Sequence, residues 1–202
     1  MATAEHKHSG ADFEHEAMDE GWKPRDAILG VIAFVVIAAI ALGGYLFYQS
    51  SKAPPVKEGD QAPSFTLPLM GGGEVSLADY RGKVVVLNVW ATWCGPCREE
   101  MPSMQRLYQS LKGQPFEMLA VSIDTRGSQD VDPFVKKLNL TFPVLYDTDK
   151  KVPSLYQTTG VPESFIIDKN GVVAKRIIGP IYDWNNAQTE EYQLIRQLLR
   201  SQ

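Results

Sequence analysis

The two cysteines of the chain, Cys94 and Cys97, are separated only by Gly-Pro and stand where an apolar run meets a segment of helical spacing. The run, residues 84–89, reads Val-Val-Val-Leu-Asn-Val, and its β-branched content predicts a buried strand. At such a junction the first thiol lies over the unpaired N–H groups and the positive dipole end of the helix. The feature therefore predicts an α/β domain built around a redox-active thiol pair.

The sequence lacks the additional residues that other functions of a cysteine pair would need. A structural zinc site needs four ligands, and no second cysteine pair or histidine follows Cys97. A cysteine–histidine hydrolase needs an imidazole to take the thiol proton, yet His6, His8 and His15 all lie in the first fifteen residues. A buried cysteine pair without chemistry is the remaining alternative. We interpret the pair as redox-active and expect neither a metal site nor a cofactor.

A membrane span is predicted over residues 27–48, which carry no charged side chain and are rich in Ile, Val, Leu and Ala. As a helix this run is about 33 Å long, enough for a hydrocarbon core of about 30 Å. A cleaved signal peptide would begin with a short basic region, whereas 26 residues precede this run and seven of them are acidic. We therefore expect an uncleaved anchor.

The anchor divides the rest of the chain into three further parts. Residues 1–26 are polar and lack apolar periodicity, so we expect a disordered tail. Residues 49–61 contain Ser-Ser and Pro-Pro pairs and are predicted to be a linker. Residues 62–202 remain for one globular domain. The net charge of −4 and the lack of a basic stripe argue against a nucleic-acid partner.

Hydrophobic periodicity and turn signals arrange the elements of this domain in an α/β order. Asp130 or Asp132 is expected to cap the helix at 131–138, and Asn170-Gly171 is expected to supply two positive φ values for a tight turn. The expected elements are a β-hairpin at 63–77, strands at 84–89, 116–123, 142–146, 164–168 and 172–178, and helical segments after Cys94 and at 131–138, 152–157 and 192–199.

The chain resembles one known family most specifically in Trp93-Cys94-Gly95-Pro96-Cys97, Glu100-Met101-Pro102 and Gly160-Val161-Pro162-Glu163-Ser164-Phe165. From about residue 62 to about residue 200 it resembles the thioredoxin superfamily, and more narrowly the membrane-anchored TlpA, ResA and CcmG type, which serves cytochrome c maturation. The resemblance implies a thioredoxin-like fold with an N-terminal β-hairpin, preceded by one transmembrane helix. It also implies a single-pass protein of the bacterial cytoplasmic membrane whose soluble domain faces the periplasm or the outside.

Cys94 is the predicted nucleophile and Cys97 the resolving thiol. An ordinary cysteine with a pKa of about 8.5 is about 3% thiolate at pH 7, whereas one with a pKa of about 7 is half ionised. A helix N-terminus and local hydrogen bonds can supply that shift, which is worth about 2 kcal/mol. Cys94 would attack a substrate disulfide, and Cys97, one helical turn further on, would then attack Cys94 and release the reduced substrate.

Glu100 is the predicted proton carrier of the site. It lies three residues after Cys97, on a neighbouring face of the expected helix. A partly buried carboxyl there would have a raised pKa and could exchange protons with the thiols, and the resemblance to the ResA branch implies the same role. A solvated first-turn glutamate is the alternative. Thioredoxins proper carry a buried aspartate six residues before the first cysteine, where this chain has Asn88, which cannot exchange protons at neutral pH.

Trp93, Val161 and Pro162 are the predicted substrate-binding residues. The resemblance implies a cis Val161-Pro162 bond beside the active site, where the backbone of Val161 pairs with an extended substrate. From the sequence alone, an ordinary trans turn proline is the alternative. Trp93 flanks the thiol closely enough to line its access. Glu163 is similar to the glutamate of the CcmG-type Pro-Glu-Thr pattern, with no role assigned to it beyond packing.

We expect a thiol-disulfide oxidoreductase that reduces disulfides outside the cytoplasmic membrane. The resemblance implies that its substrate is the Cys-x-x-Cys-His segment of apocytochrome c and that a transmembrane thiol carrier is its electron donor. A general disulfide oxidant or isomerase and a non-catalytic thioredoxin-like assembly factor stay open as alternatives. Copper delivery would need Cys-x-x-x-Cys with a distant histidine, and a peroxiredoxin-type peroxidase would need Thr-x-x-Cys; the chain has neither pattern.

Overall fold

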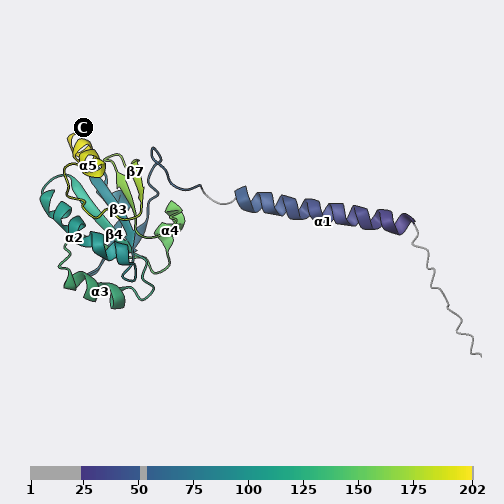
Figure 1. Ribbon diagram of the computed structural model, residues 1–202, viewed down its shortest axis with the longest axis horizontal. Coiled ribbons are helices and arrows are strands. Elements are labelled where there is room, and N and C mark those ends of the chain that lie inside the picture. Colours follow the sequence, from purple (N-terminus) through teal and green to yellow (C-terminus); the bar gives the residue numbers. More distant parts are fainter. Residues whose placement is uncertain (1–23, 51–53, 202) are drawn as a thin grey trace, which may run out of the picture. The chain divides into compact units, whose positions relative to one another are not determined.

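The computed structural model describes residues 24–50 and 54–201, and the chain divides into two compact units between Lys52 and Ala53 (Figure 1). Residues 1–23 of the predicted tail and residues 51–53 of the predicted linker lie outside the described residues. The tail and the linker therefore stay predictions.

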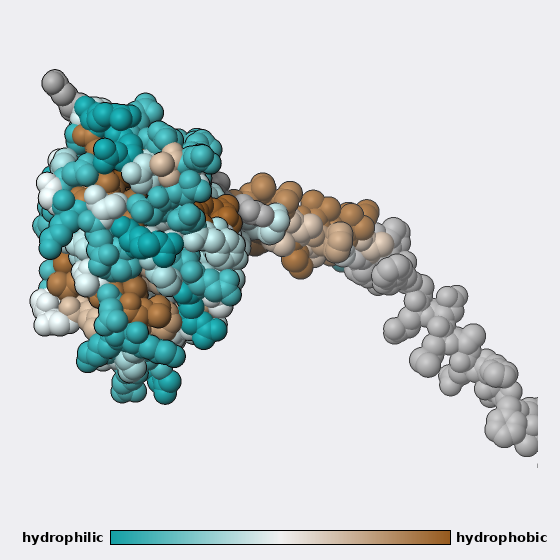
Figure 2. Space-filling view, turned by 60° about the vertical axis from the view of Figure 1, so that its left-hand side comes forward, coloured by the Kyte–Doolittle hydropathy of each residue, from teal (hydrophilic) through white to brown (hydrophobic). Residues whose placement is uncertain are grey.

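The first unit is dominated by one helix, α1 (Pro24–Ser50). Its segment Ala27–Tyr48 has a mean hydropathy of 2.7, and none of it is buried within the structure. Apolar side chains colour much of its surface brown in Figure 2. The segment coincides with the predicted range and is long and apolar enough to cross a membrane, so α1 is a candidate membrane span.

A five-stranded sheet forms the centre of the second unit. Its strands are β3 (Val84–Trp90), β4 (Phe116–Ser122), β5 (Val144–Tyr146), β6 (Glu163–Ile167) and β7 (Val173–Ile178). The order across the sheet is β5-β4-β3-β6-β7; β5, β4 and β3 run parallel, whereas β6 and β7 join by antiparallel pairing. Every residue of β3 is buried, as its apolar sequence predicted, because β3 is the middle strand.

Within residues 54–201, four α-helices surround this sheet (Figure 1). The helix after the cysteine motif, α2, buries Met101, Met104 and Leu107, whose spacing of three places them on one face. The alternation of strands and helices follows the predicted α/β order, with α2 directly after the central strand. The helices are α2 (Gly95–Ser110), α3 (Ser128–Lys137), α4 (Lys151–Tyr156) and α5 (Glu190–Arg200).

The segment before β3 contains the predicted β-hairpin. The strands β1 (Thr66–Pro68) and β2 (Glu74–Ser76) pair antiparallel, and the three glycines between them, residues 71–73, all have positive φ. The short 3₁₀ helix η1 (Leu77–Tyr80) follows. This N-terminal extension reaches both outer strands of the main sheet: Gly59 N–H donates to the Val173 carbonyl of β7 (2.9 Å), and Met70 N–H donates to the Val144 carbonyl of β5 (2.9 Å).

The predicted cap of the helix at 131–138 was wrong. α3 begins earlier, at Ser128, and its N-cap is Gly127, which provides no side-chain hydrogen bond. Asp130 therefore lies in the first turn, where it forms an ion pair with Arg126. Asp132 lies inside the helix and accepts the Tyr146 hydroxyl of β5.

The predicted turn at Asn170-Gly171 was wrong in one respect, because only Gly171 (φ 76°) has a positive φ. The Asp168 carboxylate accepts the backbone N–H groups of Asn170 (2.9 Å) and Val172 (2.8 Å), which stabilises a different turn. The register of β6 and β7 also shifts next to this turn, so that a bulge replaces the expected two-residue hairpin.

Candidate functional site

A disulfide between Cys94 and Cys97 lies at the start of α2. Cys94 is the N-cap residue, and its sulfur accepts the backbone N–H of Cys97 (3.2 Å) and is bonded to the Cys97 sulfur at 2.09 Å. Cys94 is 6% exposed and Cys97 is fully buried, so an incoming sulfur can reach only Cys94. The N–H donor and the helix dipole favour a negative charge on Cys94 once the disulfide is reduced.

Asp124 holds the turn that leads into the disulfide, and sequence reasoning missed it. Its carboxylate accepts the Thr92 N–H (2.9 Å), the Thr92 hydroxyl (2.5 Å) and the Ser122 hydroxyl (2.7 Å). Thr92 lies two residues before Cys94, so these bonds fix the backbone between β3 and α2. The available signal was the position of Asp124 just after β4, because the carboxyl ends of neighbouring parallel strands lie at one edge of a sheet.

The bond between Val161 and Pro162 is cis and lies in the loop between α4 and β6. The Val161 carbonyl oxygen lies 3.5 Å from the Cys94 sulfur, and the Pro162 carbonyl accepts the Gly179 N–H (3.0 Å). Within residues 54–201, the Val161 N–H has no hydrogen-bond partner. A free backbone N–H beside a reactive sulfur can pair with an extended polypeptide.

Glu100, on α2, is fully buried, which rules out the alternative of a solvated glutamate. Its carboxyl oxygens accept the side-chain N–H of Asn88 (2.9 Å) and the backbone N–H of Ile181 (3.0 Å). Burial raises the pKa of the Glu100 carboxyl from 4.5 to about 7, whereas these two hydrogen bonds act to lower it. The Trp184 indole also acts to lower this pKa, although its N–H makes no hydrogen bond of ordinary geometry. A carboxyl with a pKa near 7 can both release and take up a proton at neutral pH.

Asn88 links Glu100 to the strand that follows Pro162. Its side-chain N–H groups donate to Glu100 and to the Ser164 hydroxyl (2.9 Å), while its Oδ1 has no hydrogen-bond partner among the described residues. Rotation of the Asn88 amide would turn this oxygen toward Glu100. The network therefore has an acceptor for the O–H that a protonated Glu100 presents.

Trp93, which precedes Cys94 in the sequence, is 65% exposed, and its role in lining the access to the thiol stays a prediction. Sequence reasoning missed two other exposed apolar residues, Ile178 (68% exposed) and Tyr182 (59% exposed). They lie on either side of Gly179, whose N–H donates to Pro162. No periodic pattern marked them, because they lie at the end of β7 and in the loop that follows it.

Comparisons with known proteins agree with this chemistry. Residues 58–176 match the AhpC/TSA family. The chain is 41% identical over 150 residues to the thiol-disulfide oxidoreductase ResA of Geobacillus kaustophilus, a match that covers 73% of this chain and 84% of that protein. It is 36% identical over 162 residues to ResA of Bacillus subtilis, a match that covers 77% of this chain and 88% of that protein.

A solved structure from Chlorobium tepidum, described as the thiol:disulfide interchange protein DsbE, is similar to this chain with a TM-score of 0.63 and 35% sequence identity. The match covers 71% of this chain and 98% of that one. The comparisons confirm the predicted thioredoxin-like fold and the predicted enzyme class. The chain belongs to the AhpC/TSA family and is a thioredoxin-like thiol-disulfide oxidoreductase of the ResA/DsbE type.

Proposed function

We propose that this protein reduces disulfides of other proteins on the outer side of the cytoplasmic membrane. The Cys94 thiolate attacks one sulfur of the substrate disulfide, which forms a mixed disulfide and expels the other substrate sulfur as a thiol. The Cys97 thiolate then attacks Cys94, which restores the Cys94–Cys97 disulfide and releases the second substrate thiol. The substrate gains two electrons, and a transmembrane thiol carrier returns two electrons to the protein.

The observation that carries this proposal is the unequal exposure of two bonded sulfurs at a helix start. Cys94 is partly accessible and accepts an N–H hydrogen bond, whereas Cys97 is fully buried behind it. The first sulfur is therefore suited to attack and the second to resolve the intermediate. Because Cys97 is buried, its proton needs a nearby buried acceptor, and we assign that role to Glu100, one turn further along α2.

The proposed substrate is the Cys-x-x-Cys-His segment of apocytochrome c, reduced before haem attachment. Two features support this choice: the resemblance to the ResA branch, which serves cytochrome c maturation, and the apolar helix α1, which would hold the domain at the membrane. The backbone of Val161 would pair with the substrate segment, beside Pro162, and Trp93 would line its approach. These three residues therefore form the proposed substrate-binding site.

A Cys97→Ser variant of the full chain tests the reaction and the substrate together. Without the resolving thiol, the mixed disulfide on Cys94 should accumulate and survive non-reducing electrophoresis, so that mass spectrometry can identify its partner. Cys94→Ser is the matched control and should capture nothing. Capture of apocytochromes supports the proposal, capture of other exported proteins alone refutes the substrate, and an empty Cys94 refutes the reaction.

The direction of electron transfer has its own test, because a disulfide oxidant would share the same motif. Potentials within this superfamily differ by about 150 mV, or about 7 kcal/mol for two electrons. Equilibrating the Cys94–Cys97 pair against a thioredoxin couple and against glutathione measures the reduction potential of the pair. A potential close to that of thioredoxin supports a reductase, and a strongly oxidising potential refutes it.

A further inference from the structure

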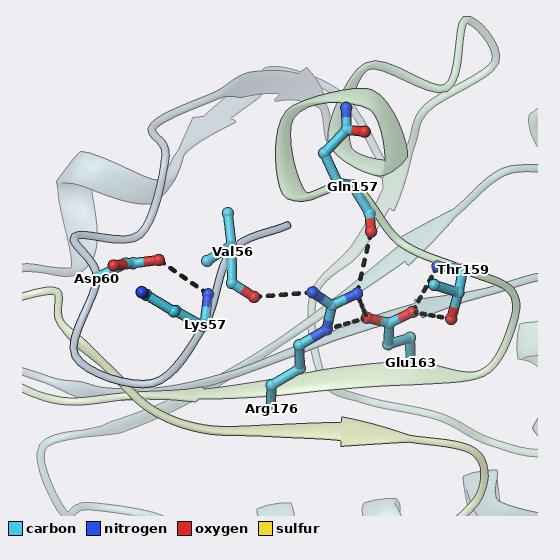
Figure 3. Close-up of polar contacts among 7 residues, drawn as sticks. All are labelled: Val56, Lys57, Asp60, Gln157, Thr159, Glu163 and Arg176. Carbon is cyan, nitrogen blue, oxygen red and sulfur yellow. Dashed lines mark hydrogen bonds and ion pairs between the residues drawn. The ribbon is translucent and has the colours of Figure 1, made fainter. Parts of the chain in front are cut away.

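Glu163 and Arg176 form a buried ion pair, here called the clasp (Figure 3). Glu163 is the first residue of β6, directly after Pro162, and Arg176 lies on β7. Arg176 Nε donates to Glu163 Oε1 at 2.6 Å, and Arg176 Nη2 lies 2.6 Å from the same oxygen. The Glu163 side chain is fully buried and that of Arg176 is 12% exposed, so water screens this pair only weakly.

Strand register brings the two charges together. Glu163 pairs with Ile178 and Phe165 pairs with Arg176, which makes Glu163 and Arg176 diagonal neighbours on one face of the antiparallel pair. The guanidinium also lies over the Phe165 ring, 5.5 Å from its centroid. Because an unpaired buried charge is strongly unfavourable, each partner holds the other in this position.

The clasp holds the loop that carries Val161 through two backbone groups that precede Val161. Next to α4, Arg176 Nη2 donates to the Gln157 carbonyl (3.0 Å). Within the loop, Glu163 Oε2 accepts the Thr159 N–H (2.9 Å). Val161 lies between Thr159 and Glu163, and its carbonyl oxygen is 3.5 Å from the Cys94 sulfur. The same two charged side chains thus tie the backbone that leads into Val161 to the sheet strands that follow it.

The clasp also binds the start of the domain. Arg176 Nη1 donates to the Val56 carbonyl (2.8 Å; Figure 3). The Val56 N–H donates to the Tyr156 carbonyl (3.3 Å). One guanidinium therefore joins the start of the domain, at Val56, to the two ends of the loop between α4 and β6, at Gln157 and Glu163.

We propose that Glu163 and Arg176 are positioning residues, which hold the Val161 backbone so that an extended polypeptide can pair with it while its disulfide meets Cys94. This inference rests on the proposed function. Neither residue touches the reacting sulfurs; both act through the loop. The substrate class follows from the loop, because a free N–H presented by Val161 favours a partner that has a peptide backbone.

Comparing the reduction of a large and a small disulfide substrate distinguishes a positioning role of the clasp from a merely structural one. Insulin presents a peptide backbone that can pair with Val161, whereas hydroxyethyl disulfide presents none. Loosening the loop should lower kcat/KM for insulin about tenfold, mainly through KM, which corresponds to the loss of one or two backbone hydrogen bonds. The kcat/KM for hydroxyethyl disulfide should change by less than about twofold in the same variants.

The variants are Glu163→Gln, Arg176→Met and the double variant, each prepared as the full chain in detergent. The double variant removes both charges at once, so it leaves no unpaired buried charge and keeps the test valid if a single variant fails to fold. Lys175→Gln is the matched control, because Lys175 neighbours Arg176 on β7 but forms its ion pairs with Glu190 and Glu191 of α5. The control should reduce both disulfides like the wild type.

A selective loss of insulin reduction in the double variant supports the clasp as a positioning device. The proposal is overturned if that variant reduces insulin as fast as the wild type, or if both disulfides slow by the same factor. A wild-type chain that reduces neither disulfide refutes the proposed function instead, and this result is distinguishable because it needs no variant.

Discussion

Replacing Glu100 by glutamine should change how the stability of the protein depends on pH. The pKa of this carboxyl is about 7 in the folded chain, compared with 4.5 for an ordinary glutamate. Between these pH values the folded chain holds a proton that the unfolded chain has released. Raising the pH through this interval therefore favours unfolding, and the stability supplied by the protonated form is lost as the pH passes the folded pKa.

The size of the effect follows from the width of the interval. The difference between about 7 and 4.5 amounts to about 3 kcal/mol, at about 1.4 kcal/mol per pH unit. Glutamine stays neutral over the whole range and resembles the protonated carboxyl. Its amide oxygen can still accept the Ile181 N–H, and its N–H can donate to the free Oδ1 of Asn88 once that amide rotates. The variant should therefore fold and lose this pH dependence.

Urea unfolding of the oxidised fragment from residue 54 to the C-terminus measures the effect, at pH values from below 4.5 to above 7. The free energy of unfolding of Glu100→Gln relative to the wild type should rise by about 3 kcal/mol across this range. Glu99→Gln is the matched control, because Glu99 is the exposed neighbour on the same helix and should follow the wild type. A difference between Glu100→Gln and wild type that does not vary with pH would refute the raised pKa and the proton-carrier role built on it.

Three further outcomes are expected. Asp124→Ala should lower the free energy of unfolding by about 2–4 kcal/mol in chemical denaturation, because it leaves the partly buried donors of Thr92 and the buried hydroxyl of Ser122 without their acceptor, whereas Asp124→Asn should lower it less. Leu107→Ala should cost about 2–5 kcal/mol by the same measurement, because it opens a cavity under α2, while Gln109→Ala on the exposed face should change stability by less than about 0.5 kcal/mol. Deleting residues 24–50 should move the protein from the membrane fraction to the soluble fraction in cell fractionation with insulin reduction intact, and a deleted form that stays in the membrane fraction would contradict α1 as the anchor.

Local sequence patterns predicted those parts of the site that are set by neighbours along the chain. Cys94 and Cys97 are three residues apart, so a strand followed by a helix is enough to place one sulfur at the helix start and the other beneath it. Glu100 lies one turn later on the same helix, and its burial follows from that spacing. The predicted ends of the hairpin and the strands differ from the observed ends by up to three positions, because pairing ends gradually there.

Other parts of the site depend on register between strands, which no local pattern encodes. Glu163 and Arg176 are thirteen residues apart in sequence and meet because a bulge near the turn sets their diagonal pairing. Asp124 approaches Thr92 because β3 and β4 are parallel neighbours with ends at the same edge. A family resemblance predicted the cis bond at Pro162, whereas the bare sequence favoured trans.

The N-terminal extension also has a consequence for solubility. Through Gly59 and Met70 it occupies backbone groups at both rims of the sheet, which would otherwise offer templates for further strands. A fragment that begins at the first residue of β3 would expose the backbone groups of both outer strands. We expect light scattering to show that such a fragment self-associates at concentrations at which the fragment from residue 54 stays monomeric. The extension would then prevent edge-to-edge association of the sheet with other copies of the chain.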